Sequence, residues 1–323
     1  MKVIGMGNAL VDVLTLVHDD EVLTHLDLPK GSMQLVDSDT SRMIHHHTQD
    51  MPRSKAAGGS AANTINGLAK LGIETAFIGH IGNDDTGQFF RKDMEENGIR
   101  PHLFSSNTPS GIANALISPD GERTFATYLG AALELSAEHL DTSLFSGYDY
   151  FYVEGYMVQN EMLLKKAFEL ARQQGLQIVL DLASFNVVEA NKRLLSEVLS
   201  ESVDIVFANE EEARAYTGKN PEEALEILAS ICRIAIVKTG AQGSLIQSGS
   251  EKVKVDAIPA KAIDTTGAGD LFASGFLYGL LHNMDLGRAG KAGSLLAGNV
   301  VEVIGPKMDI DRWDQIRSSL QTI

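Results

Sequence analysis

The alternation of short apolar runs with amphipathic segments in the second half of the chain constrains its fold more than any other feature. Four runs rich in β-branched and aromatic residues stand at 150–153, 177–181, 204–208 and 234–238. Between them, residues 160–174 and 222–230 have the apolar spacing of helices, and Gly175 is placed to end the first helix. This alternation predicts an α/β fold with a mainly parallel central sheet. In such a fold, ligands bind beyond the carboxyl ends of the strands.

Two other stretches lack this alternation and have the period-two pattern of strands. The pattern is found at residues 31–36, 111–117 and 123–128, with a turn signal at 119–121. We predict that these stretches form one small β-sheet, which covers the strand ends as a lid. The predicted core then consists of residues 1–11, 52–99 and 130–323, and the predicted lid of residues 12–51 and 100–129.

Charge indicates which partners the protein can bind, and cysteine content indicates its compartment. The 323 residues include 43 acidic and 27 basic ones, and the formal charge of -16 disfavours binding to nucleic acid or to an anionic membrane surface. The single cysteine, Cys232, leaves no internal disulfide and is typical of a reducing compartment, so we expect a cytoplasmic protein. Asp12 interrupts the first apolar stretch before it reaches the length of a signal peptide. We therefore expect a small-molecule partner and a monomer or homodimer.

The strongest candidate site is the segment Asp264-Thr-Thr-Gly-Ala-Gly-Asp270, which we expect to join a strand to a long apolar helix. Gly267, Ala268 and Gly269 carry little bulk, so backbone amides without helical partners can approach an anion there. Asp270 lies in the first turn, where the helix dipole favours the ionised carboxylate. It is therefore suited to act as the base for an attacking hydroxyl in phosphoryl transfer. From these residues alone, a tight turn with an acidic helix cap is the alternative.

The opening segment, from Val3 to Asp12, is a strand that runs into a turn and contains Gly5-x-Gly7. A dinucleotide-binding oxidoreductase needs a third glycine, and Leu10 occupies its place. No acidic residue follows at the usual distance after a second strand. The chain also lacks a Walker lysine motif, which excludes the usual phosphate-loop enzymes.

Two motifs resemble the paired signatures of the ribokinase-like carbohydrate and nucleoside kinases. They are Gly58-Gly-Ser-Ala-Ala-Asn63 and Asp264-Thr-Thr-Gly-Ala-Gly-Asp270, in the expected order, and the resemblance runs through almost the whole chain. It implies a three-layer α/β core with a β-sheet lid, and phosphorylation of a hydroxyl by ATP with Mg²⁺. It also implies that Asp270 is the catalytic base and that residues 267–269 form the anion hole. A regulator with an inactive kinase fold is the alternative, and such a protein would lose the base.

The resemblance places the acceptor substrate at the N-terminal motifs. Gly58 and Gly59 correspond to a hinge between core and lid that also contacts substrate, and Asn63 corresponds to a residue that hydrogen-bonds a substrate hydroxyl. Asp12, with Asn8 nearby, corresponds to the residue that holds vicinal hydroxyls of a sugar or ribose. A carboxylate suits this role because it can accept two hydroxyls at once. From the residues alone, the glycine pair is a flexible loop before a helix.

The resemblance places the nucleotide and its metal at later turns. Asn209-Glu-Glu-Glu212 resembles an Asn-x-x-Glu that acts through water on Mg²⁺ and phosphates, although the same residues also form a capping box. The loop that receives the nucleotide corresponds to Lys238, Thr239, Gly240 and Gly243. In this family a monovalent cation such as K⁺ binds beside the anion hole, at positions that correspond to Asp264 and Thr266.

The resemblance is closest to the adenosine kinases, particularly the bacterial type, through the segments 6–13, 154–156, 207–210 and 264–272. It implies that the acceptor is adenosine, phosphorylated at its 5′-hydroxyl to give AMP. A kinase for ribose, fructose or a related sugar is the alternative, because simple sugar kinases share Thr266. Arg123 is either a lid residue that reaches the phosphates on closure or an exposed hairpin residue. Residues 45–47, three histidines, are expected on a solvated lid surface rather than at a zinc site.

Overall fold

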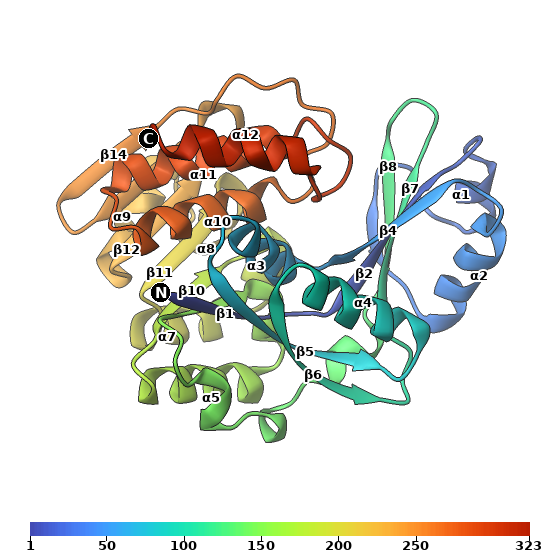
Figure 1. Cartoon of the computed structure of the whole chain (residues 1–323), viewed down its shortest axis with the longest axis horizontal. Helices are drawn as coiled ribbons and strands as arrows, with labels where there is room; N and C mark the ends of the chain where they lie inside the picture. Colours follow the sequence, from blue (N-terminus) through green and yellow to red (C-terminus); the bar gives the residue numbers. More distant parts are fainter.

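A nine-stranded sheet runs through the larger part of the molecule (Figure 1). The computed structural model describes residues 1–323. The strand order is β14-β13-β12-β11-β10-β9-β1-β5-β6; the pairs from β12 to β6 are parallel, and β13 and β14 are antiparallel. The strands are β1 (Lys2–Met6), β5 (Glu74–Gly82), β6 (Ile99–Ser106), β9 (Tyr150–Glu154), β10 (Gln177–Asp181), β11 (Ile205–Asn209), β12 (Ile234–Lys238), β13 (Ser244–Ser248) and β14 (Glu251–Val255). The four strands predicted in the second half of the chain are confirmed as β9 to β12.

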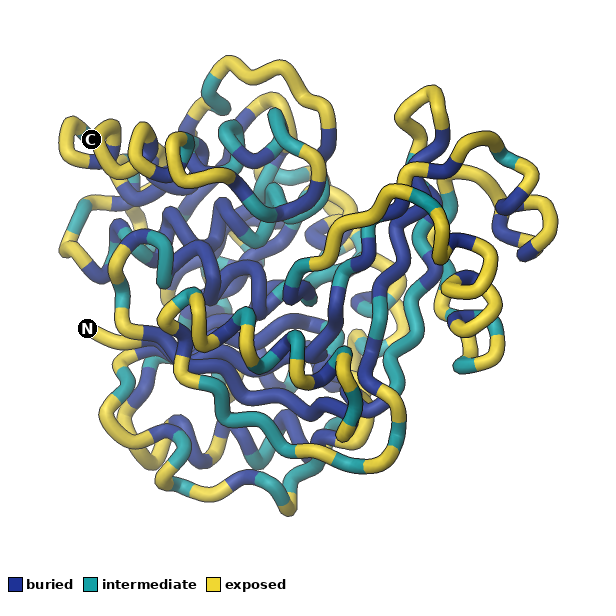
Figure 2. Tube along the Cα trace, turned by 45° about the vertical axis from the view of Figure 1, so that its right-hand side comes forward, coloured by how far each residue is buried: buried dark blue, intermediate teal, exposed yellow.

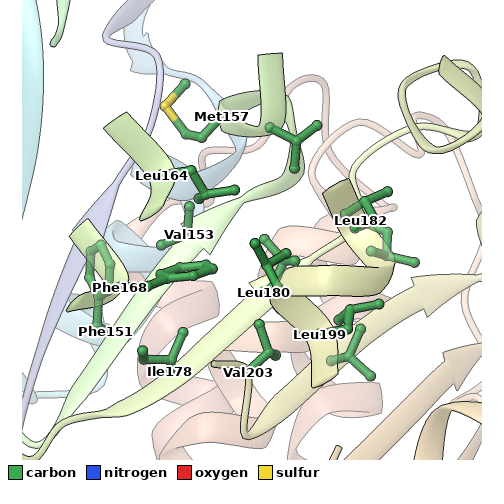
Figure 3. Close-up of a cluster of buried hydrophobic side chains, with 14 of the residues drawn as sticks. Phe151, Val153, Met157, Leu164, Phe168, Ile178, Leu180, Leu182, Leu199 and Val203 are labelled. Carbon is green, nitrogen blue, oxygen red and sulfur yellow. The ribbon is translucent and has the colours of Figure 1, made fainter. Parts of the chain in front are cut away.

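Helices cover both faces of this sheet, because successive strand residues point to opposite sides. On one face, Phe151 and Leu180 pack against Leu164 and Leu199 of the covering helices (Figure 3). That face is covered by α5 (Glu161–Gln173), α6 (Phe185–Ala190), α7 (Lys192–Glu201), α8 (Glu210–Thr217) and α9 (Pro221–Ile231). The other face is covered by α3 (Ser60–Lys70), α4 (Asp85–Glu96), α10 (Ala268–Leu281) and α11 (Leu286–Val300), with α12 (Ile310–Leu320) packed on α11. Figure 2 shows the buried strands between the partly exposed helices.

No helix in the structure combines the length and the apolar character needed to cross a membrane.

The second, smaller sheet projects from one end of the core and has the order β3-β8-β7-β2-β4 (Figure 1). Its strands are β2 (Leu10–Leu16), β3 (Met33–Leu35), β4 (Arg53–Gly58), β7 (Gly111–Ile117) and β8 (Arg123–Tyr128). Helices α1 (Glu21–His25) and α2 (Ser38–Thr48) pack on its side away from the core, through Ile44, Leu116 and Ala126. The sequence did not predict α2, whose first turn is capped by the side chain of Asp37.

The chain crosses between the two sheets at points that differ from those predicted. β4 lies within the predicted core but pairs antiparallel with β2 in the small sheet. β6 lies almost entirely within the predicted lid but pairs parallel with β5 in the large sheet. A period-two pattern indicates a strand without indicating its partner, because tertiary packing decides the pairing.

The segment between β14 and the glycine-rich turn is irregular, so the strand expected directly before that turn is not formed. β14 ends at Val255, and Pro259 lacks the N–H group that a strand ladder needs. The N–H groups of Ile263 and Asp264 both donate to the carbonyl of Val301 at the end of α11, at 2.7 and 3.1 Å. The turn is therefore held by a neighbouring helix end and not by a strand.

Candidate active site

The glycine-rich turn forms the N-terminus of α10, as predicted. Gly267 caps the helix with a φ of 78°, and a Cβ there would lie 2.7 Å from the Cβ of Pro306, so glycine is required. The amides of Gly267, Gly269 and Asp270 donate no hydrogen bond within the chain, whereas that of Ala268 donates to Thr265 at 3.1 Å. The free amides at the positive end of a helix dipole make an anion hole. Two of the three predicted positions, Gly267 and Gly269, have free amides, whereas the amide of Ala268 is used within the turn and that of Asp270 is free instead.

Asp270 lies beside this anion hole, between α10 and α3. Its two carboxylate oxygens accept hydrogen bonds from the Ser60 hydroxyl at 2.7 Å and from the Asn63 side-chain amide at 3.0 Å. Burial raises the pKa of Asp270 to about 6, and the two hydrogen bonds oppose that rise. The sequence led us to expect the helix dipole to dominate, but removal of water by the surrounding residues has the larger effect. The carboxylate is still the main form at neutral pH.

The glycine pair at the end of β4 allows the chain to pass close to the polar groups of Asp12 and Asn8. A Cβ on Gly58 would lie 2.2 Å from the carboxyl atoms of Asp12. Gly59 has a φ of 95°, and a Cβ there would lie 2.3 Å from the carbonyl oxygen of Asn8. The side-chain oxygens of Asn8 and Asn63 are buried and accept no hydrogen bond within the chain. These acceptors, together with the carboxylate of Asp12, are available to substrate hydroxyls.

Glu154, at the end of β9, was not among the predicted site residues. One of its oxygens accepts the backbone and side-chain N–H groups of Asn8, each at 2.9 Å, and the other accepts the N–H of Ala61 at 2.9 Å. A Cβ on Gly7 would lie 2.3 Å from this carboxylate. Burial raises the pKa of Glu154 to about 7, and the three N–H donors oppose the rise. Glu154 therefore orients Asn8 and the start of α3.

A cavity of about 890 Å³ extends from the anion hole along the ends of β11 and β12. Its apolar wall is formed by Ile258, Phe272, Ala297 and Val301. Of the predicted residues, it brings together Asn209, Glu212, Lys238, Gly240, Gly243, Gly267, Ala268, Gly269 and Asp270. Thr239 does not line the cavity; its N–H donates to the carbonyl of Gly243 at 2.8 Å and so shapes the loop.

Lys238 and Asp181 form a buried ion pair at the anion-hole end of the cavity. Their charged atoms are 2.7 Å apart, and a Cβ on Gly269 would lie 3.1 Å from the ammonium of Lys238. Asp181, at the end of β10, is the second site residue that the sequence did not reveal. The positive charge of Lys238 beside the free amides of the anion hole suits the phosphate groups of a nucleotide.

Glu212 forms the capping box that the sequence predicted. Its two oxygens accept the backbone and side-chain N–H groups of Asn209, at 2.8 and 2.7 Å. The pKa of Glu212 is raised to about 7, first by burial and then by the nearby charge of Asp181. A divalent cation held through water would relieve this repulsion, so the residues fit Mg²⁺ that arrives with a nucleotide.

At the predicted monovalent-cation position, the carboxylate of Asp264 already has a cationic partner. The carboxylate of Asp264 accepts the N–H of Thr266 at 2.9 Å and the N–H of Gly305 at 2.6 Å, and it forms an ion pair with Arg123. Arg123 is therefore not an exposed hairpin residue. Its guanidinium is paired with Asp264 in this structure. Two backbone N–H groups and the positively charged guanidinium of Arg123 already surround the carboxylate.

The remaining candidates of the sequence lie away from the cavity. His45, His46 and His47 stand in the last turn of α2, on the outer side of the lid.

An enzyme that moves a phosphoryl group to an alcohol needs a base, an anion hole and a cover against water. The cavity brings together a buried carboxylate and free helix amides that are suited to the first two roles, and the small sheet is a candidate for the third. The molecule is a phosphotransferase with an alcohol group as acceptor. The chain belongs to the pfkB family of carbohydrate kinases, whose sequence pattern matches residues 38–312. Kinases of this family use ATP, typically with Mg²⁺.

Individual relatives include both nucleoside and sugar kinases. The structure of adenosine kinase from Sinorhizobium meliloti superimposes with a TM-score of 0.88 at 32% identity, covering 98% of this chain and 99% of that one. The structure of a probable sugar kinase from Rhizobium etli gives a TM-score of 0.88 at 32% identity, covering 98% of both chains. A 5-dehydro-2-deoxygluconokinase from Bacillus licheniformis is 31% identical over 280 residues, which is 78% of this chain and 83% of its own length.

Proposed function

We propose that the enzyme transfers the γ-phosphate of ATP to the 5′-hydroxyl of adenosine and releases AMP and ADP. The observation that carries the choice of acceptor is the apolar inner face of the lid, which lies on the same side as the hydroxyl acceptor Asp12. A nucleoside has a ribose for the polar groups and a flat apolar base for such a wall, whereas a free sugar has only hydroxyls.

The alternation of side chains along the lid strands defines its two faces. The outer face packs against α1 and α2 through Leu116 and Ala126. The inner face carries Asp12, Leu14, Leu16, Met33, Leu35, Arg123 and Phe125, as the strand registers require. Two contacts orient this face toward the core: Arg123 pairs with Asp264, and Leu14 lies against Gly305, where a Cβ would be 3.1 Å from its Cδ2 atom.

Apolar side chains on the inner face are open to solvent. Met33 and Leu35 are 69% and 70% exposed, and Leu16 is 49% exposed. Met33 and Leu35 lie on the edge strand β3, separated by β8 and β7 from the strand that carries Asp12, and exposed apolar groups on the same face as polar site residues are typical of a ligand surface. A purine base would cover this surface, while Asp12, Asn8 and Asn63 would hold the ribose hydroxyls.

Each group of residues around the cavity would have its own role in phosphoryl transfer. Asp270 accepts the proton of the 5′-hydroxyl, because its carboxylate is ionised at neutral pH and is held by Ser60 and Asn63. The anion hole and Lys238 stabilise the charge on the transferred phosphoryl group. Mg²⁺, held through water near Asp181 and Glu212, would neutralise phosphate charge when bound.

A sugar kinase is the second candidate. It is favoured by the similarity to the 5-dehydro-2-deoxygluconokinase and to the probable sugar kinase. Such an acceptor would use the same base, anion hole and Asp12, but it would leave the apolar inner face uncovered.

We expect ADP release with ATP and Mg²⁺ to be fastest with adenosine in a panel that also contains inosine, guanosine, ribose and fructose. Leu35→Ser should raise the KM for adenosine by about tenfold, because burying a leucine side chain is worth about 1.5–3 kcal/mol. Met43→Ser is the matched control, since Met43 is a 48% exposed apolar residue on α2 of the outer side. Turnover of ribose or fructose alone would exclude adenosine, and turnover of none of the five would exclude both adenosine and the simple sugars as acceptors.

We expect kcat to fall by about tenfold per pH unit below pH 6, because the base must be ionised and each unit below its pKa lowers that fraction tenfold. Burial raises the pKa of Asp270 to about 6, so the loss sets in on the acid side of neutrality. Burial also raises the pKa of Asp12 to about 7, but Asp12 binds the acceptor, so its protonation should raise KM. The measurement is AMP formation at saturating substrates from pH 8 to pH 5, and a kcat constant over this range would contradict the assignment of Asp270.

A further inference from the structure

An ion pair joins the lid directly to the segment that forms the anion hole. Arg123 begins β8 on the inner face of the lid, and Asp264 lies just before the glycine-rich turn. The Arg123 side chain is 13% exposed and the Asp264 side chain 2% exposed, so the pair is shielded from water. Shielded pairs are screened little by salt, and the loss of one partner leaves the other charge unpaired.

Arg123 occupies the place that a separate cation would take at the carboxylate of Asp264. One oxygen accepts the N–H of Thr266 and contacts the guanidinium, and the other accepts the N–H of Gly305. The two N–H groups leave part of the carboxylate free, but the guanidinium of Arg123 occupies that part, and its positive charge repels a second cation. The guanidinium is always protonated, so it supplies a permanent positive charge.

We propose that the guanidinium of Arg123 takes the place of a monovalent cation at Asp264, so that phosphoryl transfer needs no K⁺. The arginine is a positioning residue, because it acts through Asp264 on the turn that carries the free amides of Gly267 and Gly269. Unlike a bound ion, this charge moves with the lid. Asp264 is therefore neutralised only when the lid lies over the site, and the anion hole is completed by closure.

The first test compares the wild-type enzyme in KCl and in tetramethylammonium chloride at constant ionic strength. We expect the same kcat and the same unfolding temperature in both salts. The inference rests on the proposed phosphotransfer site but not on the acceptor, and the unfolding temperature is measured without any substrate. A failure of the adenosine assignment is therefore distinguishable from a failure of this inference. Clear activation of the wild-type enzyme by K⁺ would overturn it.

The second test exposes Asp264 by removing the guanidinium. Arg123→Ala should lower kcat in tetramethylammonium, and K⁺ should restore it by about tenfold, the size expected when a buried carboxylate regains a partner. K⁺ should also raise the unfolding temperature of this variant. Arg123→Lys keeps the charge and should respond to K⁺ less than the alanine variant does.

The control is Arg42→Ala, which removes another lid arginine that is paired with an aspartate, Asp39, on the exposed surface of α2. It should show no response to K⁺ in either measurement. If Arg123→Ala also shows no response of kcat or unfolding temperature to K⁺, the guanidinium is not a substitute for a cation and the inference is wrong.

Discussion

Replacing Asp270 by Asn should lower kcat by a factor on the order of 10² or more, while ATP and the acceptor still bind. The amide has nearly the shape of the carboxylate and can still contact Ser60 and Asn63, but it cannot take the proton of the attacking hydroxyl. Steady-state kinetics gives kcat, and equilibrium titration of the nucleotide gives its affinity. The expected pattern is a large loss in kcat with a small change in binding.

Asp285→Asn is the matched control for this substitution. Asp285 also lies at a helix N-terminus, where its side chain accepts the N–H of Arg288 at 2.8 Å as the cap of α11, and it does not line the cavity. Asn caps helices as well as Asp does, so kcat and stability should stay near the wild-type values. If Asp270→Asn kept a near-normal kcat, Asp270 would have no part in the mechanism.

Gly58→Ala should raise the KM for the acceptor by about 10- to 100-fold, since a charge-assisted hydrogen bond is worth about 1.5–3 kcal/mol. The backbone at Gly58 is outside the positive-φ region, so alanine is not strained there. Its Cβ would lie 2.2 Å from the carboxyl atoms of Asp12, which must move away from the acceptor. The KM for ATP should change little, because Asp12 does not line the nucleotide cavity.

Gly287→Ala provides a control in which the same methyl group meets no such obstacle. A Cβ there would lie 3.3 Å from the nearest atom, in Asp285. Both KM values should stay near wild type. An unchanged acceptor KM in Gly58→Ala would show that the position of Asp12 does not determine acceptor binding.

The sequence predicted those parts of the fold that depend only on neighbouring residues, such as apolar strands, helix caps and tight turns. The strands β9 to β12 are short apolar runs, and the helix α5 has both its cap, Asn160, and its terminal Gly175 in the sequence. The turn at Gly267 is also local, because small residues before an apolar helix indicate free amides without any knowledge of the rest of the chain. Asp270 was found for the same reason.

The residues that were missed depend on contacts between distant parts of the chain. Glu154 and Asp181 are single acidic residues at the ends of apolar strands, and nothing beside them in the sequence shows what they contact. Glu154 holds Asn8, which is 146 positions away. The raised pKa of Asp270 has the same origin, because the burial that causes it comes from several elements. The one available signal was their place at the carboxyl ends of parallel strands.

The glycine pair 58–59 connects lid strand β4 to helix α3 without any intervening loop. The first turn of α3 carries Ser60 and Asn63, the two partners of Asp270. A rotation of the lid about this pair therefore shifts the groups that aim the base. We therefore expect ATP hydrolysis in the absence of an acceptor to be slow, because a lid turned away from the core would leave the carboxylate of Asp270 poorly aligned for a water molecule.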